Sequence, residues 1–295
     1  WSTVYAGTAI LAVLVGSQTG GSIGHFFVAL LKEFGWSRTL LSGAFSLVRI
    51  EGSLLGPIEG VLTDKLGPHT MVLLGGIFAS VGFVLLARVD SAADFYIALL
   101  AITGGVGFGS VIPVTAAVNW WFDRDRSKAI SRAMAGVGMG ALWSPLIAII
   151  LTNFGWRTAA YSIALSLLLF VVPLSRLLRP PQFNPEHIID PPTSVTVHPK
   201  SPQVELPNQE FTFMEAVKTR AFWLIPLVHA TNGFSASAVY VHGIPHLSDQ
   251  GFSPQFAGYI FFVYGGVEVL VRMFGGFMGD KFDKRLVIFA YCTVM

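Results

Sequence analysis

Long apolar runs separated by short polar loops make up most of the chain. Eight runs are long enough to cross a bilayer, because a hydrocarbon core of about 30 Å needs about 20 apolar helical residues. They cover residues 3–31, 39–61, 70–89, 94–121, 129–153, 158–178, 220–245 and 255–279. A ninth run begins near Leu286, and the sequence stops at Met295. The pattern predicts an all-α integral membrane protein, and we interpret the short ninth run as a truncated helix.

Basic residues are distributed unevenly between the loops. If residue 1 is cytoplasmic, thirteen of the 19 lie in cytoplasmic loops: Lys65, Arg124, Arg126, Lys128, Arg132, Arg176, Arg179, Lys200, Lys218, Arg220, Lys281, Lys284 and Arg285. Four lie in the opposite loops, namely Lys32, Arg38, Arg88 and Arg157. Cytoplasmic loops carry an excess of lysine and arginine. We therefore expect residue 1 and the loops after even-numbered spans to be cytoplasmic.

Residues 179–217 differ in composition from the apolar runs on both sides. Eight of the 16 prolines fall there, among few large apolar residues. Such a composition is typical of an extended linker and not of a packed domain. We expect a six-helix transmembrane bundle in residues 1–178, a cytoplasmic proline-rich linker with an amphipathic end in residues 179–217, and a partial second bundle in residues 218–295.

The composition excludes several classes of protein. Of the 295 residues, 53% are hydrophobic and 12% are charged, about half the charged share of soluble domains. The single cysteine, Cys292, excludes a disulfide framework. The net charge of +2, with basic residues in short clusters, gives no nucleic-acid-binding surface. With no nucleophile–base pair, nucleotide loop or metal-ligand cluster, we expect no enzyme, no metal and no cofactor.

One loop of the sequence recurs. A shift of 216 residues brings Gly60 onto Gly276 and Asp64-Lys65 onto Asp280-Lys281, so the second span and its exit loop recur as the eighth. Parallel repeats of two six-helix halves are a known construction of transporters, with the substrate site at their interface. The repeat therefore favours a two-bundle transporter.

The first copy, Gly60-Val-Leu-Thr-Asp64-Lys65-Leu-Gly67-Pro68, resembles the signature of the major facilitator superfamily, although proline replaces its last basic residue. The resemblance implies a major facilitator fold, with a six-helix N-terminal bundle, a partial C-terminal bundle and about eight and a half of twelve helices. We expect Gly60 to allow close helix packing, Asp64 to lie near a helix N-terminus, and Gly67 to form a sharp turn. These residues, with the copies Gly276 and Asp280, would form a hinge and lock.

Four charged residues lie at membrane depth, where each costs about 2.5–3.5 kcal/mol on insertion scales. Glu268 and Arg272 are four residues apart and share a helix face. An incoming carboxylate could take the guanidinium bidentately, and the displaced Glu268 could then take a proton. The alternative is a permanent pair that only fixes helix packing. Arg49 and Glu51, two residues apart, do not face each other, and we expect them to belong to a gating or structural network.

An acid four residues before an arginine in helix eight resembles the monocarboxylate transporter branch of the superfamily and the related oxalate–formate antiporters. The resemblance implies that Arg272 holds the substrate carboxylate and that Glu268 is its proton-sensitive partner. His25 falls near the place of a helix-one lysine in the eukaryotic branch. Gln18, Asn232 and Tyr240 are polar residues within spans and are further candidates for substrate binding.

These patterns predict a secondary active transporter of small organic carboxylates, by proton symport or anion exchange. Its partners would be an anionic small molecule, a proton or counter-anion and the lipid bilayer, with no nucleic acid. We expect a multi-pass monomer in the plasma or inner membrane. Two alternatives are a major-facilitator transporter of a non-carboxylate solute and a transporter-like receptor that binds without translocation.

Overall fold

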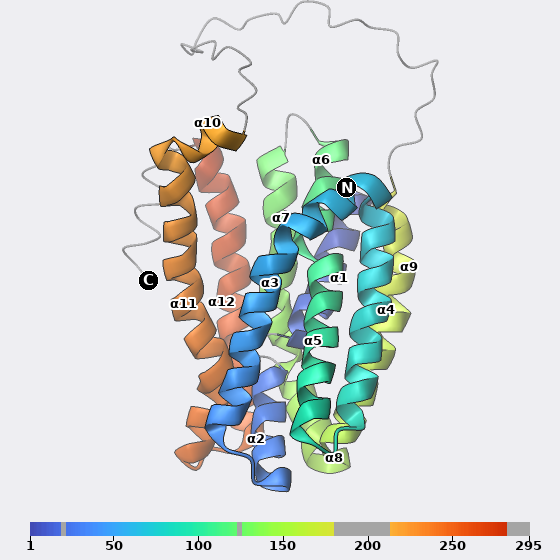
Figure 1. Cartoon of the computed structure of the whole chain (residues 1–295), viewed down its shortest axis with the longest axis vertical. Helices are drawn as coiled ribbons and strands as arrows, with labels where there is room; N and C mark the ends of the chain where they lie inside the picture. The colour runs from blue at the N-terminus through green and yellow to red at the C-terminus, as the bar shows by residue number, and fades with distance from the viewer. Residues whose placement is uncertain (19–21, 123–125, 180–212, 282–295) are drawn as a thin grey trace, which may run out of the picture. The chain divides into compact units, whose positions relative to one another are not determined.

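The computed structural model describes residues 1–18, 22–122, 126–179 and 213–281, and these fold into helices with no strand among them (Figure 1). The first helices are α1 (Ser2–Gln18), α2 (Ile23–Phe34), α3 (Arg38–Leu66), α4 (Pro68–Ala87), α5 (Ala92–Gly109) and α6 (Val111–Trp121). Then follow α7 (Arg126–Met139), η1 (Gly140–Trp143), α8 (Ser144–Ser166), η2 (Leu167–Val171), α9 (Val172–Ser175) and η3 (Arg176–Leu178). The last are α10 (Phe213–Val217), α11 (Arg220–Asp249) and α12 (Pro254–Lys281). The predicted all-α class is confirmed.

Five of the described helical stretches are long and apolar enough to cross a membrane. They are Ser2–Phe34, Pro68–Ala87, Ala92–Trp121, Lys128–Leu178 and Pro254–Gly275. The fourth contains two of the predicted spans, which divide at Gly155, where φ is 82°. Helix α3 has 29 residues but carries Arg49, Glu51 and Glu59 in its length, and it is not among the five.

Several predicted spans are interrupted inside the membrane region. The span predicted at residues 94–121 divides at Ser110, between α5 and α6. Pro113 explains this break, since it has no amide hydrogen to bond the carbonyl four residues earlier. The π-turn η2 precedes Pro173 in the same way. Pro113 and Pro173 therefore interrupt helices that the hydropathy pattern predicts to be continuous.

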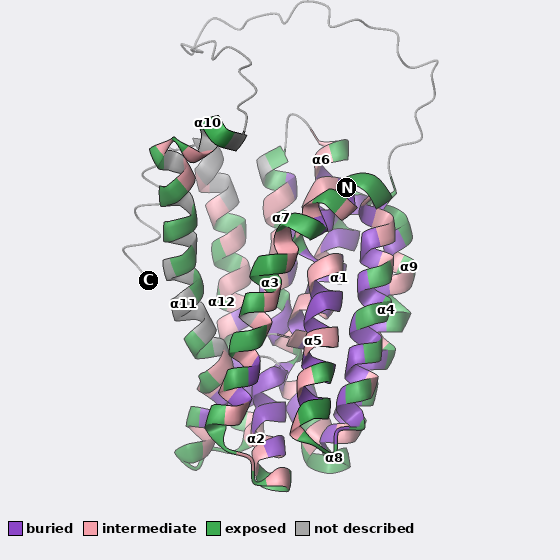
Figure 2. Cartoon of the chain, in the orientation of Figure 1, coloured by how far each residue is buried: buried purple, intermediate pink, exposed green. Residues whose placement is uncertain are grey.

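The chain divides into two compact units, residues 1–180 with 237–295, and residues 181–236. In the first unit, α4 and α5 approach each other closely through glycines. A Cβ at Gly105 would overlap the backbone of Ala79, and one at Gly82 would lie 2.5 Å from the nitrogen of Ile102. Figure 2 shows the result on α4, which has one buried face and one exposed face. These glycines therefore form the packing surface between α4 and α5.

The junction of α3 and α4 contains the predicted hinge motif. Gly67 has φ 79°, which favours glycine, and Pro68 opens α4 in the first helical position, so the sharp turn is confirmed. Two expectations are wrong for the described residues. A Cβ at Gly60 would meet no atom within 4 Å, so no close packing occurs there. Asp64 lies exposed in the last turn of α3, because that helix continues to Leu66.

Ion pairs join the helix ends at the α2–α3 loop. Arg38 donates to both oxygens of Asp249 at the end of α11, over 2.6 and 2.7 Å. Glu33, in the last turn of α2, accepts hydrogen bonds from the Trp156 indole and the Arg157 guanidinium of α8. These contacts tie α2, α3, α8 and the end of α11 together.

Replacing Gly105 by alanine is expected to lower the stability of the bundle. Overpacking of this kind costs about 1–3 kcal/mol, because the new methyl group would overlap the backbone of α4. Thermal unfolding in detergent measures the loss. Gly56→Ala is the matched control, since a Cβ there meets no atom within 4 Å. Equal melting temperatures for the two variants would contradict the packing argument.

The Arg38–Asp249 pair is expected to give a pH-dependent stabilisation. The hydrogen bond from Arg38 and its charge hold the pKa of the Asp249 carboxyl below its usual value. The pair therefore stabilises the fold above the ordinary aspartate pKa of about 3.9, and this contribution is lost as the pH falls through the lowered value.

The melting temperature of Asp249→Asn should lie slightly below that of the parent at about pH 7, with the difference closing as the pH falls through the lowered pKa of Asp249. Asp64→Asn is the control, because that exposed carboxylate has no hydrogen bond within the described residues. A difference that persists unchanged in acid would show that the charge of Asp249 is not what stabilises the contact.

Candidate functional site

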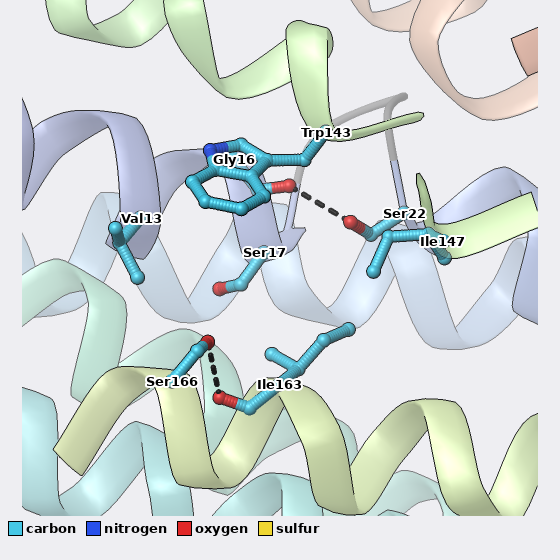
Figure 3. Close-up of a pocket in the computed structure, with 8 residues that line it drawn as sticks. All are labelled: Val13, Gly16, Ser17, Ser22, Trp143, Ile147, Ile163 and Ser166. Atoms are coloured by element: carbon cyan, nitrogen blue, oxygen red, sulfur yellow. Dashed lines mark hydrogen bonds between the residues drawn. The ribbon is translucent and has the colours of Figure 1, made fainter. Parts of the chain in front are cut away.

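A small cavity lies beside the break between α1 and α2, within the first unit (Figure 3). Its empty volume is about 300 Å³. The lining residues come from α1, the start of α2, η1 and α8: Val13, Gly16, Ser17, Ser22, Trp143, Ile147, Ile163 and Ser166. The break that opens this cavity falls in the glycine- and serine-rich stretch of the first span.

The walls of this cavity are uncharged. The Ser22 hydroxyl donates to the carbonyl of Gly16 over 3.0 Å, and the Ser166 hydroxyl donates to the carbonyl of Ile163 (Figure 3). The Ser17 hydroxyl donates to the carbonyl of Leu14 within its own helix. The serine oxygens can still accept hydrogen bonds, whereas no cationic side chain lines the space. A carboxylate would lose its hydration there without gaining a counter-charge. The cavity therefore suits water or a neutral group.

Gln18 and His25 make hydrogen bonds between helices. The Gln18 amide donates to the Thr103 hydroxyl of α5 over 3.0 Å. The His25 ring is buried, with 2% of its surface exposed, and its Nε2 lies 3.1 Å from Oγ of Ser144 at the start of α8. Both side chains hold the two halves of the first span to their neighbours.

Glu268 and Arg272 form the predicted ion pair on α12. Nη2 of Arg272 lies 2.5 Å from Oε1 of Glu268, and Nε lies 3.0 Å from the same oxygen. The Glu268 side chain is 17% exposed and that of Arg272 is 36% exposed. Nη1 of Arg272 makes no hydrogen bond to any residue that the structure describes. Among the described residues, Nη1 therefore keeps its hydrogen-bond donors unused.

Helix α12 packs against α7, η1 and the start of α8 through glycines. A Cβ at Gly265 would lie 2.6 Å from Cβ of Ala141, and one at Gly258 would lie 3.1 Å from Cα of Pro145. A Cβ at Gly138 would lie 3.2 Å from Cβ of Glu268, which places the ion pair beside α7.

The same stretch of α7 and η1 also contacts α1. A Cβ at Gly16 would lie 2.5 Å from Cα of Gly140, beside the cavity. Gly138 and Gly140 are only two residues apart, and they approach α12 and α1 respectively. The ion pair and the cavity therefore border opposite sides of one helical segment.

Some predicted site residues have side chains outside the described part of the chain. These are Arg49, Asn232, Tyr240 and Asp280, and the packing of Gly276 also lies outside it. The ninth helix predicted from Leu286 falls in the undescribed residues 282–295.

Sequence reasoning did not single out Glu59 as a functional residue. The structure buries this carboxylate to 6% exposure against Gly107 of α5. Glu51 approaches Gly104, one turn away on α5. The signal in the sequence was the eight-residue spacing of the two acids, which places them on nearly the same helix face.

Comparison of the chain with known proteins identifies its family. The Major Facilitator Superfamily profile matches residues 8–295. The chain is 27% identical over 264 residues to "Monocarboxylate transporter 13" of Rattus norvegicus, covering 88% of this chain and 56% of that protein. It is 27% identical over 278 residues to "Monocarboxylate transporter 11" of Homo sapiens, covering 92% and 56%. It is 26% identical over 262 residues to "Monocarboxylate transporter 4" of Mus musculus, covering 87% and 53%.

The chain thus spans a little over half the length of these relatives. The family profile covers nearly the whole chain and agrees with its helical architecture. This chain belongs to the Major Facilitator Superfamily.

Proposed function

We propose that the full-length protein is a secondary active transporter of small organic carboxylates, by proton symport or anion exchange. The observation that carries the proposal is the Glu268–Arg272 pair, partly buried on a helix long and apolar enough to cross the membrane. A cation at that depth is costly, and such residues mark substrate or ion pathways. The names of the relatives, monocarboxylate transporters, support an anionic substrate.

The chemistry of substrate binding follows from the geometry of the pair. In the empty site, Nε and Nη2 of Arg272 are neutralised by one oxygen of Glu268. A substrate carboxylate could approach through Nη1 and Nη2 and form the bidentate arrangement that arginine favours. It would then compete with Glu268 for the guanidinium. Binding would weaken the internal pair and leave Glu268 as the group that responds to substrate.

The remaining predicted residues have supporting roles in this proposal. His25, Gln18, Asn232 and Tyr240 would shape the path between the bundles.

The hinge motif would close the cytoplasmic side of the transporter, with Arg49 and Glu51 in the same gating network. It consists of Gly60, Asp64, Lys65 and Gly67 with the second copy at Gly276 and Asp280. The transporter would be a monomer in the plasma or inner membrane. It would comprise a six-helix bundle in residues 1–178, a cytoplasmic linker in 179–217 and a partial second bundle in 218–295.

A transporter of a neutral solute is the second candidate. The uncharged walls of the cavity beside the α1–α2 break favour it, because a neutral group would not need a counter-charge there. In that case, the Glu268–Arg272 pair would remain intact throughout the cycle and fix only helix packing.

Arg272→Ala is expected to weaken carboxylate uptake by the full-length protein in proteoliposomes. Losing a charge-assisted bidentate contact of about 1.5–3 kcal/mol corresponds to a drop of roughly tenfold to a hundredfold in apparent affinity. Uptake of radiolabelled lactate, pyruvate and oxalate, with and without a pH gradient, measures the effect. Arg272→Lys should restore it only in part, because lysine cannot bind a carboxylate bidentately.

Val271→Ala is the matched control, since this neighbour on α12 is exposed. It should transport like the parent. Undiminished uptake by Arg272→Ala would remove the proposed role of the arginine. Uptake of a sugar or another neutral solute, without competition from carboxylates, would favour the second candidate.

A further inference from the structure

Two carboxylates of α3 converge on a single turn of α5. Oε1 of Glu51 lies 3.2 Å from the position of a Cβ at Gly104, and Oε1 of Glu59 lies against the position of a Cβ at Gly107. Residues three apart on a helix lie about 5–6 Å from each other. The glycines therefore leave the space that the two acids occupy, and the acids approach the same small region.

Neither carboxylate has a hydrogen-bonding or ionic partner within the described residues. Glu59 is 6% exposed, and no donor contacts its side chain. Oε2 of Glu51 is fully buried and unpaired. Glu33, in contrast, accepts from two donors. A buried carboxylate without a partner is most stable as the neutral acid, and a second carboxylate nearby opposes ionisation of both.

Among the described residues, the helices packed against α3 offer no counter-charge at this depth. Helix α5 carries Asp94 and Tyr96 near its first turn, where the Tyr96 hydroxyl donates to the carbonyl of Leu40. Helix α4 carries His69 in its first turn, bonded to the carbonyl of Ser175, and α6 has no titratable residue. On α3 itself, the side chain of Arg49, two residues from Glu51, lies outside the described part of the chain.

We propose that Glu51 and Glu59 form a proton-binding site on α3, distinct from the Glu268–Arg272 pair on α12. The site would bind one proton on one of the two acids and release it during the transport cycle. Metal cations fit poorly, because Gly107 leaves no gap beside Glu59 and cations such as Ca²⁺ need six to eight oxygen ligands. The existence of the proton site does not depend on the proposed function. Only its coupling to carboxylate transport rests on that function.

The site has a route for proton exchange. A Cβ at Gly56 or at Gly60, each of which lies beside the acids on α3, would meet no atom within 4 Å. Water that reaches this open face of α3 could carry the proton to and from Glu59. The contact with Gly107 of α5 keeps the Glu59 carboxylate desolvated. The uncovered positions at Gly56 and Gly60 would let water approach it from the other side of α3.

Infrared spectroscopy of the full-length protein tests the site directly. The carbonyl stretch of a protonated carboxylic acid should be present in the parent at neutral pH and weaker in Glu59→Gln and in Glu51→Gln. Glutamine resembles the neutral acid in shape and charge, so these variants should melt at or above the parent temperature. Glu33→Gln, which removes a paired and ionised carboxylate, should leave this band unchanged and lower the melting temperature.

Two results would overturn the proton site. One is an identical carboxylic-acid band in the parent and both α3 variants. The other is a melting temperature lowered by Glu59→Gln as much as by Glu33→Gln, which would mean that Glu59 is ionised and paired. Glu59→Asp, which keeps the acid, provides the comparison if a glutamine variant does not fold, since its band should persist but shift.

A transport assay then tests whether this proton is coupled to substrate uptake. In proteoliposomes with a gradient of about one pH unit, one-proton symport can accumulate substrate roughly tenfold. Glu59→Gln should lose this accumulation and keep carboxylate exchange at equal pH. Accumulation at the parent level in Glu51→Gln and Glu59→Gln would overturn coupling through this site. If the parent exchanges no carboxylate, the proposed function fails, while the infrared result still decides whether the proton site exists.

Discussion

A backbone surrounded by hydrocarbon must satisfy its hydrogen bonds within its own helix, and the rest of this structure depends on that constraint. Helices cannot gain much by burying apolar side chains, because the lipid is equally apolar. They gain instead from close approach, which is why glycines mark the crossings of α4 with α5 and of α1 with η1. Each charged side chain in such a bundle is expensive, and therefore informative about function.

Much of the local structure could be predicted from the sequence. The turn at Gly67 and the pair Glu268–Arg272 depend on residues close together in the chain, and both are found as expected. Interruptions of a helix depend on local sequence too. The apolar residues around Pro113 nevertheless predict one continuous span, whereas the structure divides it into α5 and α6. Hydropathy alone cannot distinguish a straight span from an interrupted one.

Long-range contacts could not be predicted in this way. The sequence shows that Glu59 and Gly107 exist, but only the packing of α3 on α5 brings them together. The same holds for Gly60, whose expected close contact is absent from the described residues. Which face of a helix meets which neighbour is set by the whole bundle. The burial of Glu59 could therefore be recognised only from the structure.

Helix α12 meets α7, η1 and α8 through a row of glycines, at Gly138, Gly258 and Gly265. Helices usually interlock by fitting side-chain ridges into grooves, and such ridges must separate before one helix can slide along the other. A contact made of backbone against backbone has few ridges to separate. A lengthwise shift of α12 along this seam would therefore disturb fewer interlocked side chains than at a ridge-and-groove contact, and Arg272 would move with the helix.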